Sequence, residues 1–174
     1  MSKISLHCPH NRQELNYLLE LGKSAKSYLE IGARYGECLM QMGSGKERVV
    51  AVDLPGKAWG YPDSLPHLQR AAEKVGATLF IEDSTNPETV EKVRALGPYD
   101  LIFIDGDHKY EGVKKDWENY GPMGKVVVFH DIVKHNPKSK YGALEVWKLW
   151  QEIEGNKKEV IGEDSPMGIG IVWK

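Results

Sequence analysis

Cysteine is scarce in this sequence, with only Cys8 and Cys38 among 174 residues. Two cysteines are too few for a disulfide framework and are typical of a reducing compartment. No run of about 18 apolar residues is present, so no transmembrane helix is expected. The first residues also lack the continuous apolar stretch of a signal peptide. The sequence therefore predicts a cytoplasmic protein that does not enter the membrane.

A large excess of charge of one sign is missing as well. The 23 lysines and arginines nearly balance the 25 aspartates and glutamates, which gives a net charge of −2. This balance excludes a strongly basic nucleic-acid binder and a polybasic membrane anchor. The length favours one domain. We therefore expect a single domain over residues 1–174, with 1–26 as an N-terminal helical segment, as a monomer or homo-oligomer.

Helix-like and strand-like segments alternate along the whole chain, without a linker or repeat. Strands are predicted at 27–31, 48–53, 78–81, 100–104, 125–129, 159–161 and 169–173. Helices are predicted at 11–22, from Gly36 to about 43, and at 65–75, 86–96, 109–120 and 141–153. The first five strands are continuous apolar runs, which predicts helices on both faces of the sheet.

The connection lengths predict how the strands run. Each connection among the first six strands exceeds the dozen or so residues that a parallel crossover needs. The connection between Ile161 and Ile169 contains two glycines and a proline and is too short for a crossover. The last strand must therefore run antiparallel. The fold class we expect is α/β, with a Rossmann-like, seven-stranded, mostly parallel sheet and an antiparallel last strand.

Ligands of open α/β sheets bind at the carboxyl ends of the strands. The first such end carries Glu30-Ile-Gly-Ala-Arg-Tyr-Gly36, in which Gly32 and Gly36 permit a tight turn and a close approach. The spacing differs from the G-x-G-x-x-G of dinucleotide binders. Asp53 ends the second strand, 21 residues after Gly32, where a carboxylate can accept both hydroxyls of a ribose. Turn glycines and a surface carboxylate are the alternative, but together these residues predict a nucleoside pocket without a phosphate cradle.

These residues, with Glu82-Asp83-Ser84 and the reversed last hairpin, resemble a class I S-adenosylmethionine-dependent methyltransferase over residues 27–173. The stretch Phe103-Ile-Asp-Gly-Asp-His108-Lys-Tyr110, then Asp116-Trp117 and Val128-Phe-His-Asp131, resembles the small-molecule O-methyltransferase-like group that includes cephamycin-type and macrolide-sugar methyltransferases. The cofactor that this resemblance implies is S-adenosylmethionine.

The resemblance also implies roles for individual residues. Glu30 would steer the methionine ammonium, and Gly32 and Gly36 would form the loop beside the methionine moiety. Asp53 would hold the ribose. The adenine would meet Asp83 and the backbone of Ser84. Asp105 is also counted among the cofactor-binding residues, at the sulfonium end.

A second group consists of Asp105, Asp107, His108, His130 and Asp131. Asp105 and Asp131 end neighbouring strands and can converge on one hard cation such as Mg²⁺. Methyl transfer to oxygen needs a deprotonated hydroxyl, and His108 resembles the family's base, with Asp105 as its catalytic partner. Asp107 is expected to cap the next helix.

His130 is a departure from the best-known metal-dependent relatives, which carry two adjacent acidic groups where this chain has His130-Asp131. Imidazole suits transition metals better than Mg²⁺. His130 therefore either points elsewhere, selects a different divalent cation together with Asp105 and Asp131, or marks a site without a metal.

The function that these residues predict is S-adenosylmethionine-dependent O-methylation of a small molecule. Two alternatives stay open. One is a module that binds the nucleoside without catalysis, and the other is a Rossmann-like protein that binds NAD or a nucleotide sugar.

Overall fold

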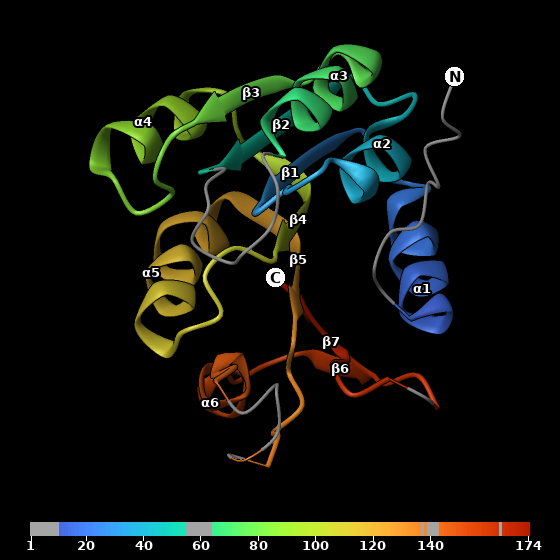
Figure 1. Cartoon of the computed structure of the whole chain (residues 1–174), viewed down its shortest axis with the longest axis vertical. Helices are drawn as coiled ribbons and strands as arrows, with labels where there is room; N and C mark the ends of the chain where they lie inside the picture. The colour runs from blue at the N-terminus through green and yellow to red at the C-terminus, as the bar shows by residue number, and fades with distance from the viewer. Residues whose placement is uncertain (1–10, 55–63, 137, 139–142, 164) are drawn as a thin grey trace.

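The computed structural model describes residues 11–54, 64–136, 138, 143–163 and 165–174. Seven strands form one sheet: β1 (Ser27–Ile31), β2 (Arg48–Asp53), β3 (Thr78–Ile81), β4 (Tyr99–Ile104), β5 (Gly124–His130), β6 (Lys157–Val160) and β7 (Ile169–Trp173). Their order is β3-β2-β1-β4-β5-β7-β6 (Figure 1). The first five strands are parallel, and β7 lies antiparallel between β5 and β6. The predicted fold class is confirmed, including the reversed last strand.

The α-helices of the described residues are α1 (Arg12–Gly22), α2 (Glu37–Gly43), α3 (Leu65–Val75), α4 (Pro87–Ala95), α5 (Tyr110–Tyr120) and α6 (Val146–Glu152). The helix expected at 141–153 is shorter than predicted. Residues 143–145 precede it without helical structure, because the backbone N–H of Glu145 donates to the carbonyl of His108 at 2.7 Å. The bond joins this segment to the loop that follows β4.

Helices cover both faces of the sheet. Side chains of α4, α5 and α6 pack with one face into a core that includes Val93, Val113 and Trp150, and side chains of α1, α2 and α3 pack with the other around Leu18, Leu39 and Leu68 (Figure 1). The edge strand β3 is the exception, since its ends are exposed. No helix in the described part of the chain has the length and apolar character that crossing a membrane requires.

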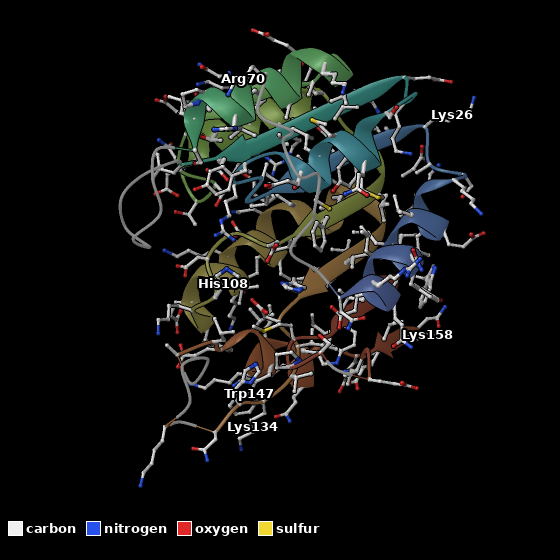
Figure 2. All side chains as sticks on the ribbon, turned by 45° about the vertical axis from the view of Figure 1, so that its right-hand side comes forward. Lys26, Arg70, His108, Lys134, Trp147 and Lys158 are labelled. Atoms are coloured by element: carbon white, nitrogen blue, oxygen red, sulfur yellow. The ribbon has the colours of Figure 1, made fainter. Side chains whose placement is uncertain are left out.

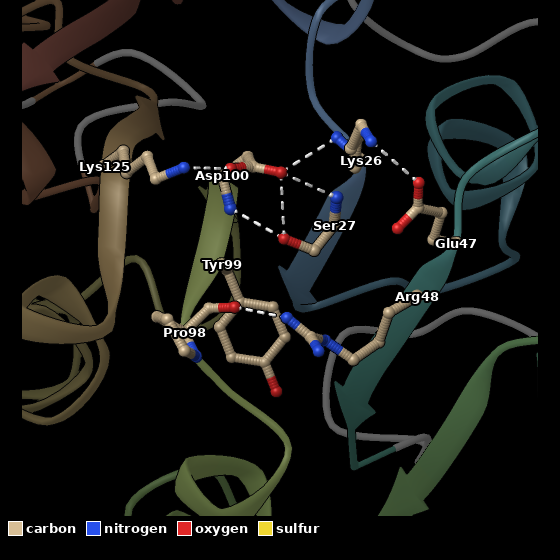
Figure 3. A pocket seen from close by; sticks show the side chains of 8 residues that line it. All are labelled: Lys26, Ser27, Glu47, Arg48, Pro98, Tyr99, Asp100 and Lys125. Carbon is tan, nitrogen blue, oxygen red and sulfur yellow. Dashed lines mark hydrogen bonds and ion pairs between the residues drawn. The ribbon is translucent and has the colours of Figure 1, made fainter.

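Asp100 holds the amino ends of β1, β4 and β5 together at the edge of the sheet opposite the expected site (Figure 3). Its carboxylate accepts hydrogen bonds from the backbone of Lys26 at 2.9 Å and of Ser27 at 3.1 Å, and from Lys125 Nζ at 2.6 Å. The Lys125 bond, with those from Lys26 and Ser27, lowers the pKa of Asp100. A pocket of about 240 Å³ lies here. The groups around Asp100 pair with one another, so we interpret this edge as a structural clamp.

Candidate active site at the carboxyl edge of the sheet

Gly32 is required by the way the end of β1 meets the chain after β4. Its φ is +87°, and a Cβ at this position would lie 2.2 Å from the carbonyl oxygen of Asp105. Gly36 begins α2 with φ +79°, and its Cβ would lie 2.3 Å from the Cβ of Ala71 on α3. Both glycines therefore serve packing in this structure, and their predicted place beside the cofactor stays a prediction.

Two of the predicted site carboxylates, Glu30 and Asp53, lie at the carboxyl ends of β1 and β2. Asp53 accepts a hydrogen bond from the backbone N–H of Arg34 at 2.7 Å and so holds a residue whose φ is +51°. Burial raises the pKa of Asp53, although hydrogen bonds from the backbone of Arg34 and Ala33 oppose the shift. Glu30 is 1% exposed and accepts a hydrogen bond from the Tyr28 hydroxyl at 2.7 Å. Asp53 thus supports the loop, whereas the bond of Glu30 lies within β1. Their contacts with the ribose and the methionine end stay predictions.

The predicted adenine side is fixed by α5. Ser84 donates its hydroxyl to Asp116 at 2.7 Å, and its carbonyl accepts a hydrogen bond from the Tyr120 hydroxyl at 2.6 Å. Asp83 accepts hydrogen bonds from the backbone and hydroxyl of Thr85, both at 2.8 Å. Sequence reasoning assigned Asp116 and Tyr120 no role, although their spacing of four residues places them on one face of the predicted helix.

The buried carboxyl of Asp116 predicts an unusual pH dependence of stability. Asp116 is fully buried, and its Oδ2 has no hydrogen-bond partner among the described residues. Burial, together with the charges of Asp107 and Asp83, raises the pKa of Asp116 to about 7 against the opposing Ser84 bond. The folded state therefore holds a proton that the unfolded state releases near pH 4, so this group makes stability fall between about pH 4 and pH 7.

Asp116→Asn removes this titration, and we expect the variant to be more stable than the parent at pH 8. The gain has an upper limit of about 4 kcal/mol, from a shift of about three pKa units. Urea unfolding at pH 5 and pH 8 measures it. Glu118→Gln, an exposed change on the same helix, is the control. If the free energy of unfolding changes equally between pH 5 and pH 8 in the parent and in Asp116→Asn, Asp116 does not cause the pH dependence.

The second predicted group comes together at the ends of β4 and β5. Nδ1 of His108 lies 2.5 Å from Asp131 Oδ2. Nδ1 of His130 lies 3.2 Å from Asp105 Oδ1 and 3.3 Å from Asp131 Oδ1. His108, labelled in Figure 2, lies in the loop between β4 and α5, two residues before the helix begins. The exposed Asp107 accepts the backbone N–H of Lys109, one residue before the first residue of α5, and is not part of this cluster.

The two histidines carry the charge that balances the two aspartates. Burial lowers the pKa of both imidazoles, but it is outweighed by the hydrogen bond from His108 to Asp131 and by the charge of Asp105 beside His130. Both pKa values are therefore raised. Burial would raise the pKa of Asp131, but the hydrogen bonds from the two histidines lower it. Two adjacent carboxylates need a cation or a proton nearby, and here the imidazoles supply it.

Three residues of the same cluster could together hold a metal ion. Asp105, His108 and Asp131 each offer a ligand atom, and these atoms lie within 4.8 Å of one another. The imidazole in this set is His108, whereas the sequence had suggested His130. Two carboxylates and one imidazole suit a transition metal such as Mn²⁺ better than Mg²⁺.

Ala143 and Glu145, just before α6, contact the loop that carries His108. Lys109 Nζ donates to the carbonyl of Ala143 at 2.9 Å, in addition to the Glu145–His108 backbone bond. Lys134 lies with its Nζ 4.6 Å from the centre of the Trp147 ring (Figure 2). The segments that the sequence offers as candidates for recognising the acceptor are 1–12, 54–66 and 132–141. Of these, residues 1–10, 55–63, 137 and 139–141 lie outside the described residues.

Glu14 was missed by sequence reasoning. It is fully buried on α1, and its Oε2 lies 3.9 Å from His130 Nε2. The sequence does contain a pattern that points to Glu14, because this residue is spaced four residues from Leu18 and eight from Gly22, the other buried positions of α1. An acidic residue on the apolar face of a helix indicates a buried partner.

A family model described as a methyltransferase domain matches residues 29–132. Among curated proteins, no sequence matches significantly. Solved structures share the fold. Cofactor-bound Rv0187 from MTB aligns with a TM-score of 0.70 and 17% identity over 99% of this chain and 83% of the other.

An O-methyltransferase from Bacillus cereus in complex with SAH aligns with a TM-score of 0.61 and 16% identity, covering 95% of this chain and 82% of its own. The N-methyltransferase NodS from Bradyrhizobium japonicum WM9, in complex with S-adenosylhomocysteine, aligns with a TM-score of 0.65 and 16% identity. The alignment covers 92% of this chain and 85% of NodS. At these identities the likeness is one of fold, and it includes enzymes that methylate different atoms.

Proposed function

This chain belongs to the methyltransferase-domain family and is an S-adenosylmethionine-dependent methyltransferase, and from that premise we propose that it methylates a hydroxyl oxygen of a small molecule. The observation that carries the proposal is the contact of His108 with Asp131, at 2.5 Å, beside Asp105. An amine acceptor that is already neutral needs little help to lose a proton, whereas a hydroxyl needs a base or a Lewis acid. This cluster offers an imidazole as a base, and three side chains that could hold a metal ion as a Lewis acid.

Two residues of this chain, His108 and Asp131, suffice to remove the proton from the acceptor hydroxyl. Asp131 binds Nδ1 of His108, which fixes the orientation of the ring and leaves the acceptor's proton to be taken at Nε2. As the hydroxyl oxygen bonds to the methyl carbon, the bond from that carbon to the sulfonium sulfur breaks. The products are the methyl ether, S-adenosylhomocysteine and a proton on His108.

Asp105, His108 and Asp131 would hold the metal if one is used, and a divalent cation there would orient the acceptor hydroxyl and lower its pKa. His108 and Asp131 are also bound to each other, so a metal competes with the proton that they share. A metal held through Nδ1 of His108 would therefore displace the proton shared with Asp131, whereas the base function uses Nε2.

We predict that Mn²⁺ raises the melting temperature of the protein at pH 8 and has little effect at pH 6. The reason is that the raised pKa values of His108 and His130 keep the imidazoles protonated at the lower pH. Differential scanning fluorimetry with Mn²⁺, Zn²⁺ and Mg²⁺ measures the shift, and Asp131→Asn removes most of it. A shift that is the same in parent and Asp131→Asn would place the ion elsewhere.

Asp53→Ala is predicted to weaken binding of S-adenosylmethionine by more than about tenfold, because two hydrogen bonds from ribose hydroxyls to a carboxylate are lost. Asp53 also supports Arg34, so the variant is compared with Asp53→Asn, which keeps an acceptor for the Arg34 N–H. Calorimetry measures both affinities. If Asn and parent bind equally while Ala does not, the carboxylate supports the loop and does not hold the ribose by charge.

The function is tested by incubating the protein with S-adenosylmethionine and a panel of small phenols, catechols, sugars and amines. Formation of S-adenosylhomocysteine with hydroxylated compounds supports the proposal. Formation with amines alone would overturn O-methylation. Calorimetry with NAD and a nucleotide sugar tests the alternative Rossmann-type ligands, which we expect not to bind.

A further inference from the structure

Glu14 connects the N-terminal helix to the hairpin that carries β7. Its Oε1 accepts hydrogen bonds from the backbone N–H groups of Gly162, at 3.3 Å, and of Gly168, at 3.2 Å. Both donors lie in the connection between β6 and β7, about 150 residues away along the chain. The Glu14 carboxylate is fully buried, so these bonds are formed away from competing water.

The same contact reaches the backbone of Asp131. The carbonyl of Gly168 accepts a hydrogen bond from the Asp131 N–H at 3.1 Å. Asp131 has φ +64°, in the left-handed region that a non-glycine residue adopts only when its surroundings hold it there. Two hydrogen bonds in series thus connect the Glu14 side chain, through the backbone of Gly168, to the backbone of Asp131, a strained residue of the proposed active site.

The second carboxylate oxygen of Glu14 faces His130. Oε2 lies 3.9 Å from His130 Nε2, and it is buried without a hydrogen-bond partner among the described residues. This separation is too long for a hydrogen bond, but it is within the range of an ion pair. A buried carboxylate oxygen without a hydrogen bond is costly, and the imidazole 3.9 Å away offsets the cost when it carries a proton. On its other side, Nδ1 of the same ring faces Asp105 and Asp131.

We propose that Glu14 is a positioning residue of the active site, which from α1 holds both His130 and Asp131 in place. Its Oε1 acts on Asp131 through Gly168, and its Oε2 acts on His130 by charge. The proposal rests on the function proposed above, because it assigns the work of Glu14 to the His130–Asp131 pair. A leucine at position 14 would complete the apolar face of α1 but could do neither task.

Glu14→Gln separates the two actions. The amide keeps an oxygen that accepts from Gly162 and Gly168, so the hairpin and the fold are retained, and only the charge toward His130 is lost. Glu20→Gln is the matched control, since Glu20 lies on the same helix with 67% of its side chain exposed. In ¹⁵N-histidine spectra of the full chain at one fixed pH, we expect the His130 ring nitrogen signals to move in Glu14→Gln and to stay in Glu20→Gln.

Two further measurements accompany the spectra. Affinity for S-adenosylhomocysteine stays unchanged in Glu14→Gln, whereas methyl transfer to an acceptor found in the panel falls by roughly 10- to 100-fold, as is usual when a residue behind the reacting groups is changed. His130 signals that coincide in parent and Glu14→Gln overturn the inference. A parent that does not bind S-adenosylhomocysteine overturns the proposed function instead, while the response of His130 still reports on Glu14.

If Glu14→Gln does not fold, the reciprocal experiment decides. In a ¹³C-glutamate-labelled chain, His130→Gln is expected to move the side-chain carboxyl signal of Glu14. A signal that stays in place shows that Glu14 only ties α1 to the hairpin, and overturns the inference.

Discussion

Replacing His108 with glutamine is expected to lower the rate of methyl transfer by roughly 10²- to 10⁴-fold, the usual contribution of a general base. Glutamine can still donate an N–H to Asp131, so the hydrogen bond that orients the side chain is retained. What it lacks is a nitrogen that accepts the proton of the acceptor hydroxyl. Binding of S-adenosylmethionine is expected to be unchanged, because the predicted ribose and adenine contacts come from Asp53 at the end of β2 and from Asp83 and Ser84 after β3.

The pH profile of the parent provides a second reading of His108. The imidazole accepts a proton only when it is neutral, and its pKa is raised above the ordinary value. The rate is therefore expected to rise with pH through a midpoint above about 6.5. Stopped assays of S-adenosylhomocysteine formation between pH 6 and pH 9 measure it. His67→Gln, an exposed change on α3, is the control; a His108→Gln variant with the parent's rate and profile would remove His108 from the mechanism.

Gly32→Ala is expected to lose about 3–5 kcal/mol of folding stability, together with cofactor binding. The added Cβ would lie 2.2 Å from a backbone oxygen of Asp105 and 2.5 Å from the Cα of Gly106. Backbone atoms cannot rotate away as a flexible side chain does. Either β1 and β4 separate at the very edge where the cofactor is predicted to bind, or the chain does not fold. Thermal unfolding and calorimetry with S-adenosylhomocysteine measure the two effects.

The control for this prediction must share the positive φ but not the contact. Gly45 has φ +75° and would place a Cβ with nothing within 4 Å, so Gly45→Ala is expected to cost only about 1 kcal/mol, the strain of the left-handed backbone. Gly162 is unsuitable, because its Cβ would lie 2.2 Å from the side chain of Asn11. Equal losses in Gly32→Ala and Gly45→Ala would show that φ alone, and not the contact with Asp105, makes Gly32 necessary.

The order of elements in the fold could be predicted from the sequence, because it depends on local pattern and on connection length. Apolar runs such as Arg48–Asp53 are too short for helices, and their crossovers are long enough for parallel pairing. The seven residues between Ile161 and Ile169 forced the last strand to reverse. The start of α6 could not be predicted, because it is set by the bond from Glu145 to His108, which joins two segments far apart in the chain.

The sequence by itself determined which residues meet at the carboxyl edge of the sheet, since each strand end is a local feature and parallel strands share that edge. It thereby selected Asp53, Asp105, His108 and Asp131. Only the tertiary structure decided how these groups pair. Three features depend on distances between elements that no local pattern fixes: both imidazoles face Asp131, Gly32 admits no side chain, and Glu14 lies beside His130. The physical reason is that propensity and periodicity act over a few residues, whereas charge pairing and backbone clashes are set only after the helices and strands have packed.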